Sequence, residues 1–331
     1  MELAGKKIVV IGGAGLIGSH TVDALIHEDV GEVVVYDNFA RGREENLAQA
    51  LQDPRVRIYE YGGDILQTDV LRKALEGADG VFHFAALWLL HCQDFPRSAF
   101  DVNVRGTYNV LEASVDARVE RLVYSSSASV YGDAVEEPMT EDHPFNFENF
   151  YGATKVCGEA MATALHHRFG LPFVGLRYMN VYGPRQDYHG AYIAVMMKML
   201  DNIDRGEPLV IYGDGTQAYD FVYVGDCAQA NVFAMKAETA NRYYNVGGGV
   251  RTSIRELAEL LLEITGSGVG IRYEPEGVSF VKNRIGSTEQ AEREIGFRAG
   301  VILEDGLRAL IEWRRTHIDE VDARRERSLT G

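Results

Sequence analysis

The first 37 residues carry a pattern that few folds can accommodate. A short run rich in β-branched residues, 7–11 (KIVVI), precedes a helical pattern that begins at about Leu16. Between and within them stand three glycines at three-residue spacing: Gly12, Gly15 and Gly18. A second β-branched run, 32–36 (EVVVY), ends in Asp37. This order predicts a strand, a tight turn, a helix and a second strand, because glycine allows close backbone approaches that a Cβ would block.

The same pattern is typical of dinucleotide binding. Backbone N–H groups at such a helix N-terminus can point at a pyrophosphate. Asp37 lies 19 residues after Gly18, close to the ~20-residue offset of the carboxylate that binds an adenosine ribose. A carboxylate there favours NAD over NADP, because a 2′-phosphate would meet its negative charge. We therefore predict NAD as cofactor, held by Gly12, Gly15, Leu16, Ile17, Gly18, Asp37 and Asn38.

Composition limits the other classes of function. The chain has 331 residues, 46% of them hydrophobic, enough for a sizeable core and two lobes. Its net charge of −16 opposes a nucleic-acid surface. No basic and apolar leader and no apolar run of roughly 20 residues is present, so we expect a cytoplasmic protein that does not enter membranes. The cysteines, Cys92, Cys157 and Cys227, are far apart and lack histidines at zinc spacing; we expect reduced thiols and no metal site.

Strand and helix patterns alternate through the first half of the chain. Strands are predicted at 7–11, 32–36, 56–59, 80–84, 122–125 and 173–177, with helices that include 102–117 and 151–169. Such alternation predicts an α/β fold with a doubly wound parallel sheet. The regularity fades later, where we predict a helix at 188–206, a strand at 208–212 and a helix at 253–265. The expected division is a dinucleotide-binding domain, 1–177, and a smaller α/β substrate lobe, 178–331, with segments at about 220–250 packing back on the first domain.

Tyr151 and Lys155 form the second chemical signal. Their four-residue spacing places both on one face of the predicted helix. A tyrosine with the usual pKa near ~10 is a poor base at neutral pH, so a neighbouring ammonium and a positive nicotinamide are needed to favour the phenolate. Ser127, just beyond the strand at 122–125, could hydrogen-bond the same substrate oxygen. These three residues are the predicted catalytic set.

Motifs along almost the whole chain resemble the extended short-chain dehydrogenase/reductase family, and within it the nucleotide-sugar epimerases of the UDP-glucose 4-epimerase type. They are GGAGLIGSH, YDN, GDI, HFAA, NVRGT, SSSASVYG, YGATK, RYMNVYGPRQ and YGDGTQAYDFVYVGD. The resemblance implies that Asp64 and Ile65 flank the adenine and that Ala85 and Ala86 line the nicotinamide side. It further implies cofactor contacts from Asn103, Tyr151, Lys155 and Tyr178, and the catalytic roles of Ser127, Tyr151 and Lys155.

The family runs several reactions, and two positions distinguish them. Sugar 4,6-dehydratases carry an Asp-Glu pair before the VYG segment, and the decarboxylases carry a glutamate at the second position; here the residues are Ala128 and Ser129. We therefore expect inversion at C4 of a nucleotide sugar through a 4-keto intermediate. Three alternatives remain: a 4-ketosugar reductase, a dehydrogenase of a non-nucleotide alcohol, and a catalytically silent NAD-binding regulator.

Substrate contacts are predicted from Trp88, Ser127, Asn180, Tyr219 and Arg284. Tyr219 stands where relatives commonly carry a diphosphate-binding arginine, so binding through that position is in doubt; Arg284 matches the family's second arginine. Helices 102–117 and 151–169 resemble those of a four-helix dimer interface, which implies a homodimer. The charged run 314–327 is expected to be a solvated helix end or a frayed tail.

Overall fold

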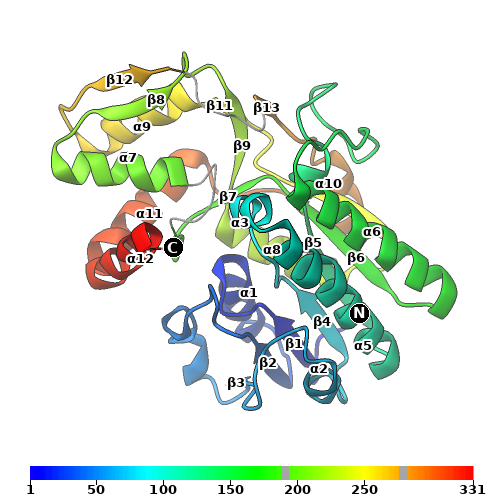
Figure 1. Ribbon diagram of the computed structural model, residues 1–331. Helices are drawn as coiled ribbons and strands as arrows, with labels where there is room; N and C mark the ends of the chain where they lie inside the picture. The colour runs from blue at the N-terminus through cyan, green and yellow to red at the C-terminus, as the bar shows by residue number, and fades with distance from the viewer. Residues whose placement is uncertain (188–193, 276–281, 331) are drawn as a thin grey trace.

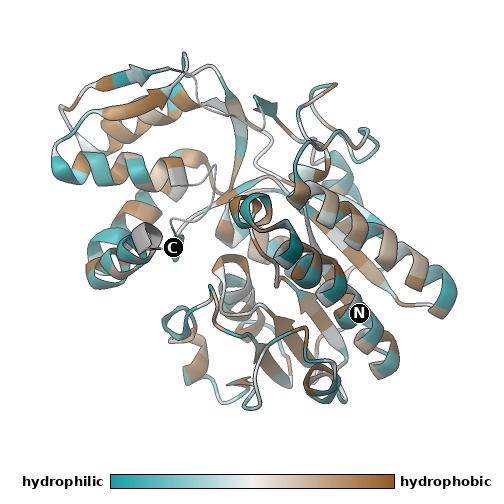
Figure 2. Ribbon diagram, in the orientation of Figure 1, coloured by the Kyte–Doolittle hydropathy of each residue, from teal (hydrophilic) through white to brown (hydrophobic). Residues whose placement is uncertain are grey.

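Seven parallel strands form the larger sheet, in the order β10-β6-β5-β4-β1-β2-β3 (Figure 1). The computed structural model describes residues 1–187, 194–275 and 282–330. The strands are β1 (Lys7–Ile11), β2 (Glu32–Tyr36), β3 (Val56–Ile58), β4 (Gly80–His83), β5 (Arg121–Ser127), β6 (Phe173–Tyr178) and β10 (Arg242–Val246). The centres of these strands are almost wholly buried. Strands buried on both faces need apolar side chains on both faces, so their sequences are continuous apolar runs, drawn in brown in Figure 2. The predicted doubly wound parallel sheet is confirmed.

Helices cover both faces of this sheet. On one face α1 (Leu16–Ile26) packs against α8 (Val224–Lys236); on the other, α5 (Thr107–Ala117) packs between α2 (Thr68–Ala74) and α6 (Phe150–Phe169). The helix predicted over 102–117 is in fact two segments. A turn of π-helix, η3 (Phe100–Gly106), precedes α5.

Within the described residues, the smaller lobe is built from short strands and four helices. Its four-stranded sheet contains β7 (Asn180–Tyr182), β9 (Ala218–Tyr223), β11 (Arg251–Ser253) and β13 (Asn283–Arg284). A separate pair joins β8 (Leu209–Tyr212) to β12 (Ile271–Glu274). The helices are α7 (Ala194–Arg205), α9 (Ile254–Thr265), α11 (Leu303–Thr316) and α12 (Ile318–Thr330). The start of the helix predicted at 188–206 lies outside the described residues, and its remainder is α7.

The chain does not divide cleanly at residue 177. Strand β10 joins the edge of the large sheet beside β6, and α8 covers that sheet together with α1. Helix α10 (Glu289–Ile295) also packs on β10. The chain therefore returns to the dinucleotide-binding domain after building the first part of the substrate lobe.

The C-terminal charged run is solvated only in part. Arg314 and Arg324, in α11 and α12, are only 5% and 3% exposed, whereas 315–319 are exposed. The guanidinium of Arg314 pairs with the carboxylate of Asp201 in α7 at 2.8 Å. The prediction of a frayed or solvated end is wrong for Arg314 and Arg324, because other segments supply partners for their buried charges. Of the helices in the described part of the chain, none is long and apolar enough to cross a membrane.

Candidate active site

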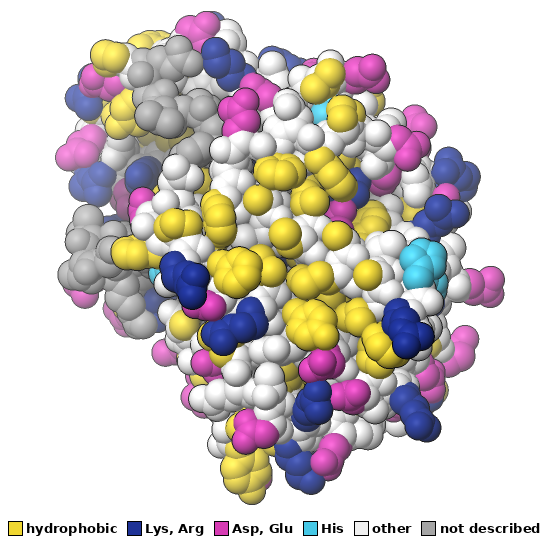
Figure 3. Space-filling model, turned by 45° about the vertical axis from the view of Figure 1, so that its right-hand side comes forward, with side chains coloured by type: hydrophobic (Ala, Val, Ile, Leu, Met, Phe, Trp, Pro, Cys, Tyr) yellow, Lys and Arg dark blue, Asp and Glu magenta, His cyan; other side chains and the backbone are white. Residues whose placement is uncertain are grey.

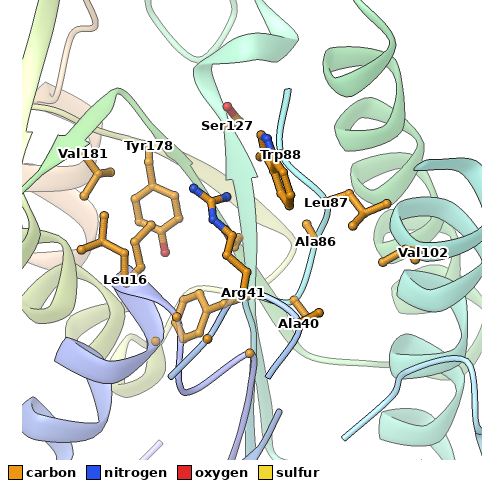
Figure 4. A pocket seen from close by; sticks show the side chains of 18 of the residues that line it. Leu16, Ala40, Arg41, Ala86, Leu87, Trp88, Val102, Ser127, Tyr178 and Val181 are labelled. Carbon is orange, nitrogen blue, oxygen red and sulfur yellow. The ribbon is translucent and has the colours of Figure 1, made fainter. Parts of the chain in front are cut away.

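A cavity of about 420 Å³ opens where the strands of the large sheet end and the smaller lobe begins. Its walls come from the segments that follow β1, β2, β4, β5 and β6, and from β13 and α12. In Figure 4, Leu16, Tyr178 and Val181 lie on one side and Ala86, Leu87 and Trp88 on the other. Ligands of doubly wound sheets bind at the carboxyl ends of the strands.

The glycine-rich turn is packed too closely for side chains. Gly12 has φ of +78°, and a Cβ there would lie 2.6 Å from the backbone nitrogen of Ala85. A Cβ at Gly18 would overlap the carbonyl oxygen of Gly12. Gly15 caps the N-terminus of α1, which carries no acidic residue in its first turn. The helix N-terminus therefore faces the cavity with free space for a phosphate and no competing carboxylate in that turn.

Most of the predicted cofactor residues line this cavity. They are Gly12, Gly15, Leu16, Ile17, Gly18, Asp37, Asn38, Asp64, Ile65, Ala85, Ala86, Tyr151, Lys155 and Tyr178. The Asp37 carboxylate accepts hydrogen bonds from the N–H groups of Ala14 (2.9 Å) and Phe39 (2.8 Å), which fix it beside the turn. Burial raises the pKa of Asp37 above its ordinary value.

Asn103 is the exception among them. Its amide lies behind the cavity wall, where Oδ1 accepts from the N–H of Leu87 at 2.7 Å and Nδ2 donates to the carbonyl of Leu87 at 3.0 Å. Nδ2 also donates to Cys92 Sγ, and burial raises the pKa of this thiol to about 11. Asn103 therefore holds the segment after β4 in place, and Cys92 is a neutral packing group.

Ser127, Tyr151 and Lys155 meet at the centre of the cavity wall. Asn149 Oδ1 caps α6 by accepting from the N–H of Gly152 (2.8 Å), so the helix begins immediately before Tyr151. Lys155, one turn later, is 3% exposed and donates from Nζ to the carbonyl of Ser125 at 2.7 Å. Its Nζ lies 5.6 Å from the centre of the Tyr151 ring.

The protein alone shifts the pKa values of this pair away from the charged forms. Burial raises the pKa of Tyr151 to about 12; a hydrogen bond with Ser127 and the charges of Arg41 and Arg284 oppose the rise. Burial also lowers the pKa of Lys155 to about 8. The phenolate predicted from the sequence therefore requires a further positive charge in the cavity, which an oxidised nicotinamide supplies.

Three of the other predicted substrate residues reach the cavity and one does not. Trp88, Asn180 and Arg284 line it, and Arg284 is 3% exposed. Tyr219, in β9, packs instead in the core of the smaller lobe, with its ring 6.2 Å from that of Phe221. The structure therefore gives Tyr219 no place among the cavity residues.

Sequence reasoning missed several polar and charged residues of the cavity, namely Arg41, Asn46, Asp187 and Arg324. Arg41 lies in the loop after β2, and Figure 4 shows its side chain between Tyr178 and Trp88. Nε and Nη2 of Arg41 donate to the carboxylate of Asp187, the latter at 2.9 Å, and its guanidinium lies 4.9 Å from the Trp88 ring. Its place beyond a strand that ends at the predicted site was a signal that could have identified it.

The model of the NAD-dependent epimerase/dehydratase family matches residues 8–247. The chain belongs to this family. The UDP-N-acetylglucosamine 4-epimerase of Methanobrevibacter ruminantium, solved with UDP-N-acetylmuramic acid, is 32% identical, with a TM-score of 0.88 over 95% of this chain and 99% of that one. The UDP-glucose 4-epimerase of Thermotoga maritima, solved with UDP-glucose, is 33% identical, with a TM-score of 0.87 over 94% and 99%.

Relatives with another reaction match almost as well. A dTDP-glucose 4,6-dehydratase of Actinoplanes sp. is 31% identical over 94% of this chain and 98% of its own length. The cofactor of the family is NAD. The residues present fit it: the open helix N-terminus at Gly15 suits the pyrophosphate, and the fixed carboxylate of Asp37 suits a ribose diol.

The buried ammonium of Lys155 should reduce stability in the absence of NAD. Because its pKa falls from the ordinary 10.5 to about 8 in the folded state, the unfolded chain binds the extra proton between these values. Stability should therefore rise with pH from about 8 to 10.5, and the full cost, on the order of 3 kcal/mol, applies below pH 8.

Lys155→Met should accordingly raise the melting temperature of the NAD-free protein at pH 7, with a gain that shrinks toward pH 10. Calorimetry across this range measures it, with Lys73→Met, an exposed lysine, as control. A Lys155→Met protein less stable at pH 7 than the parent would contradict the assignment.

Proposed function

We propose that the chain is an NAD-dependent epimerase that inverts C4 of a nucleotide sugar through a 4-keto intermediate. The observation that carries this proposal is that Ser127, Tyr151 and Lys155 line the same cavity as the glycine-rich turn. A protein that only binds NAD has no need of the three together.

Each of the three residues has a distinct part. Tyr151 Oη takes the proton of the sugar 4-hydroxyl and later returns it to the ketone oxygen. Ser127, which shares a hydrogen bond with Tyr151, binds the same substrate oxygen and holds it for the transfer. Lys155 contributes a positive charge beside Tyr151 and would hold the ribose of NAD. NAD bound in this cavity would supply the hydride chemistry at C4.

The sequence around Ser127 favours epimerisation over the other family reactions. Loss of water from C5 and C6 needs an additional acid and base near the sugar. The two positions that supply them in dehydratases are Ala128 and Ser129, and Ala128 is buried away from the cavity. With no carboxylate at either position, a keto intermediate formed here returns to an alcohol.

Arginines are proposed to bind the substrate diphosphate. Arg284, on β13, reaches the cavity from the smaller lobe, and Arg41 reaches it from the larger. Two other basic residues could stand in for the arginine missing at Tyr219. Arg185 lines the cavity but pairs with Asp23 at 2.6 Å, and Lys282 does not line it. A guanidinium matches phosphate oxygens through two parallel N–H groups, so Arg284 is the principal candidate.

The deciding experiment incubates the purified protein, without added cofactor, with UDP-, dTDP-, GDP- and CDP-sugars and follows C4 configuration by proton NMR. Interconversion of one pair supports the epimerase and identifies the substrate. A 4-keto-6-deoxy product would instead assign a dehydratase reaction to the protein. No change with any sugar, before or after NAD addition, would favour a reductase, a dehydrogenase of another alcohol or a regulator.

Tyr151→Phe should reduce turnover roughly 10²–10⁴-fold, the usual contribution of a general acid–base group, while leaving bound NAD unchanged, since it removes only the proton-transferring hydroxyl. Turnover and NAD content are measured on the same preparation. Tyr212→Phe, at an exposed site, is the control. Near-normal turnover of Tyr151→Phe would refute the mechanism.

Arg284→Ala should raise KM for the nucleotide sugar about tenfold or more, because a charge-assisted hydrogen bond contributes about 1.5–3 kcal/mol. Its charge lowers the pKa of Tyr151, which must lose its proton to act as the base, so the loss of Arg284 should also move the acidic limb of the kcat profile to higher pH. Arg308→Ala changes an exposed arginine and serves as control. A KM and pH profile like those of the parent would remove Arg284 from the site.

We also propose a homodimer formed by α5 and α6. Small or apolar side chains of α6, Cys157, Ala160 and Ala164, are exposed at helical spacing, and Tyr108 of α5 is 41% exposed. Figure 3 shows hydrophobic side chains gathered over the side of the molecule that carries these helices. Such a patch marks an interface.

Light scattering should give a molar mass twice that of one chain for the parent protein. The Ala160→Arg variant should give the mass of one chain, because the larger charged side chain would block contact between the helices. A monomeric parent would refute the dimer.

A further inference from the structure

Arg324, near the C-terminal end of the chain, is buried at the edge of the cofactor cavity. Its side chain is 3% exposed, and its guanidinium lies 5.2 Å from the Trp313 ring. Nη2 donates to Asn46 Oδ1 and Nη1 to the carbonyl of Arg185, both at 2.8 Å. Nη2 also donates to the partly exposed carboxylate of Glu320, one turn earlier in α12, at 3.3 Å. Arginine is rarely buried unless its donors are bonded, so these contacts fix its position.

Asn46 carries this contact on to the glycine-rich turn. Its Nδ2 donates to the carbonyl of Ala14 at 2.8 Å, and the same carbonyl accepts from the N–H of Arg43 at 3.0 Å. The N–H of Ala14 in turn donates to Asp37. A continuous path of hydrogen bonds thus runs from α12 through Asn46 to the turn whose amides face the pyrophosphate position.

Arg185 provides a second connection between the same elements. Its carbonyl accepts from Arg324, while its guanidinium pairs with Asp23 on α1 at 2.6 Å. Arg185 has φ of +68°, a left-handed conformation that is costly for a residue with a side chain and is held here by these contacts. Helix α12 is therefore connected both to the glycine-rich turn and to α1, the helix that follows this turn.

We propose that Arg324 is a positioning residue for NAD: through Asn46 and Arg185 it fixes the glycine-rich turn and α1, and thereby slows release of the cofactor. An epimerase cycle needs NAD that stays bound between two hydride transfers. Arg324 also lines the cavity itself, and among the described residues its buried Nε has no hydrogen-bond partner, which leaves one N–H donor at the cavity edge. The inference concerns NAD alone and does not depend on which sugar is the substrate.

The experiment measures NAD release from the full-length protein without any sugar. The NAD that copurifies is exchanged against an excess of isotopically labelled NAD, and the bound fraction is followed by mass spectrometry after denaturation. Arg324→Ala and Asn46→Ala should each speed release about tenfold, since each removes a hydrogen bond to a charged group. The double variant should be no faster than the faster single variant, because both changes break the same path.

Two further variants separate positioning from general stability. Arg308→Ala removes an exposed arginine of α11 and should release NAD at the parental rate. Arg324→Lys keeps the charge but can donate to only one of the two acceptors well, so its release rate should lie between those of the parent and Arg324→Ala. The melting temperatures of the NAD-free proteins are compared in parallel.

Parental release from Arg324→Ala would overturn the proposal. Independent effects, in which the fold-increases of the two single variants multiply in the double variant, would also overturn it. So would faster release that is fully accounted for by a lower melting temperature of the NAD-free variant. Because no sugar enters the measurement, a protein that fails as an epimerase can still confirm or refute this role of Arg324.

Discussion

Burying an ammonium group such as that of Lys155 costs free energy, and the structure around it offsets only part of that cost. The amine donates to the carbonyl of Ser125, at the end of β5, and faces the rings of Tyr124 and Tyr151 at 5.4 and 5.6 Å. This requires α6 to approach the sheet closely; a Cβ at Gly158 would overlap the Tyr124 hydroxyl. The helix can then present Tyr151 and Lys155 together only because its position over β5 is fixed.

A second buried charge holds the far side of the same helix. Glu159, the residue after Gly158, accepts two hydrogen bonds from Arg177 in β6, at 2.9 and 2.7 Å, and both side chains are 5% exposed. A buried pair of this kind contributes little net stability compared with apolar packing, but breaking it costs about 3–5 kcal/mol. Its effect is therefore to fix where α6 lies, on which the distance between Tyr151 and the end of β5 depends.

The opposite pKa shifts of Tyr151 and Lys155 suit a reaction that runs in both directions. With the protein alone, Tyr151 keeps its proton, since burial raises its pKa to about 12. A positive charge at the nicotinamide position lowers that pKa, and the loss of this charge on reduction raises it again. In the proposed reaction, the tyrosine would thus be a better base before the hydride leaves the sugar and a better acid when the ketone is protonated. The charge state of the cofactor would then set the direction of proton transfer at this hydroxyl.

The sequence was sufficient for six of the seven strands of the large sheet, all but β10, and for most of the expected cofactor residues as residues of one cavity, because local signals determine both. Apolar runs and glycine spacing place β1, α1 and Asp37 without reference to the rest of the chain. Arg324 and Tyr219 could not be placed this way. A charged residue in a charged run is buried only if another segment supplies its partners, as Asn46 does for Arg324 from 278 positions away. Likewise, the two- and three-residue strands of the smaller lobe are too short to show a period.

Those long-range partners explain how an acidic chain can bind anionic ligands. A net charge of −16 repels nucleotides at a distance, so binding must depend on fixed local charges. Around the cavity, Arg41, Arg185, Arg284 and Arg324 are contributed by different segments of the chain. Arg41 and Arg185 are paired with Asp187 and Asp23, contacts that join the two lobes. These pairs hold two arginines at the cavity, so the same contacts that join the lobes also place positive charge where an anionic ligand would lie.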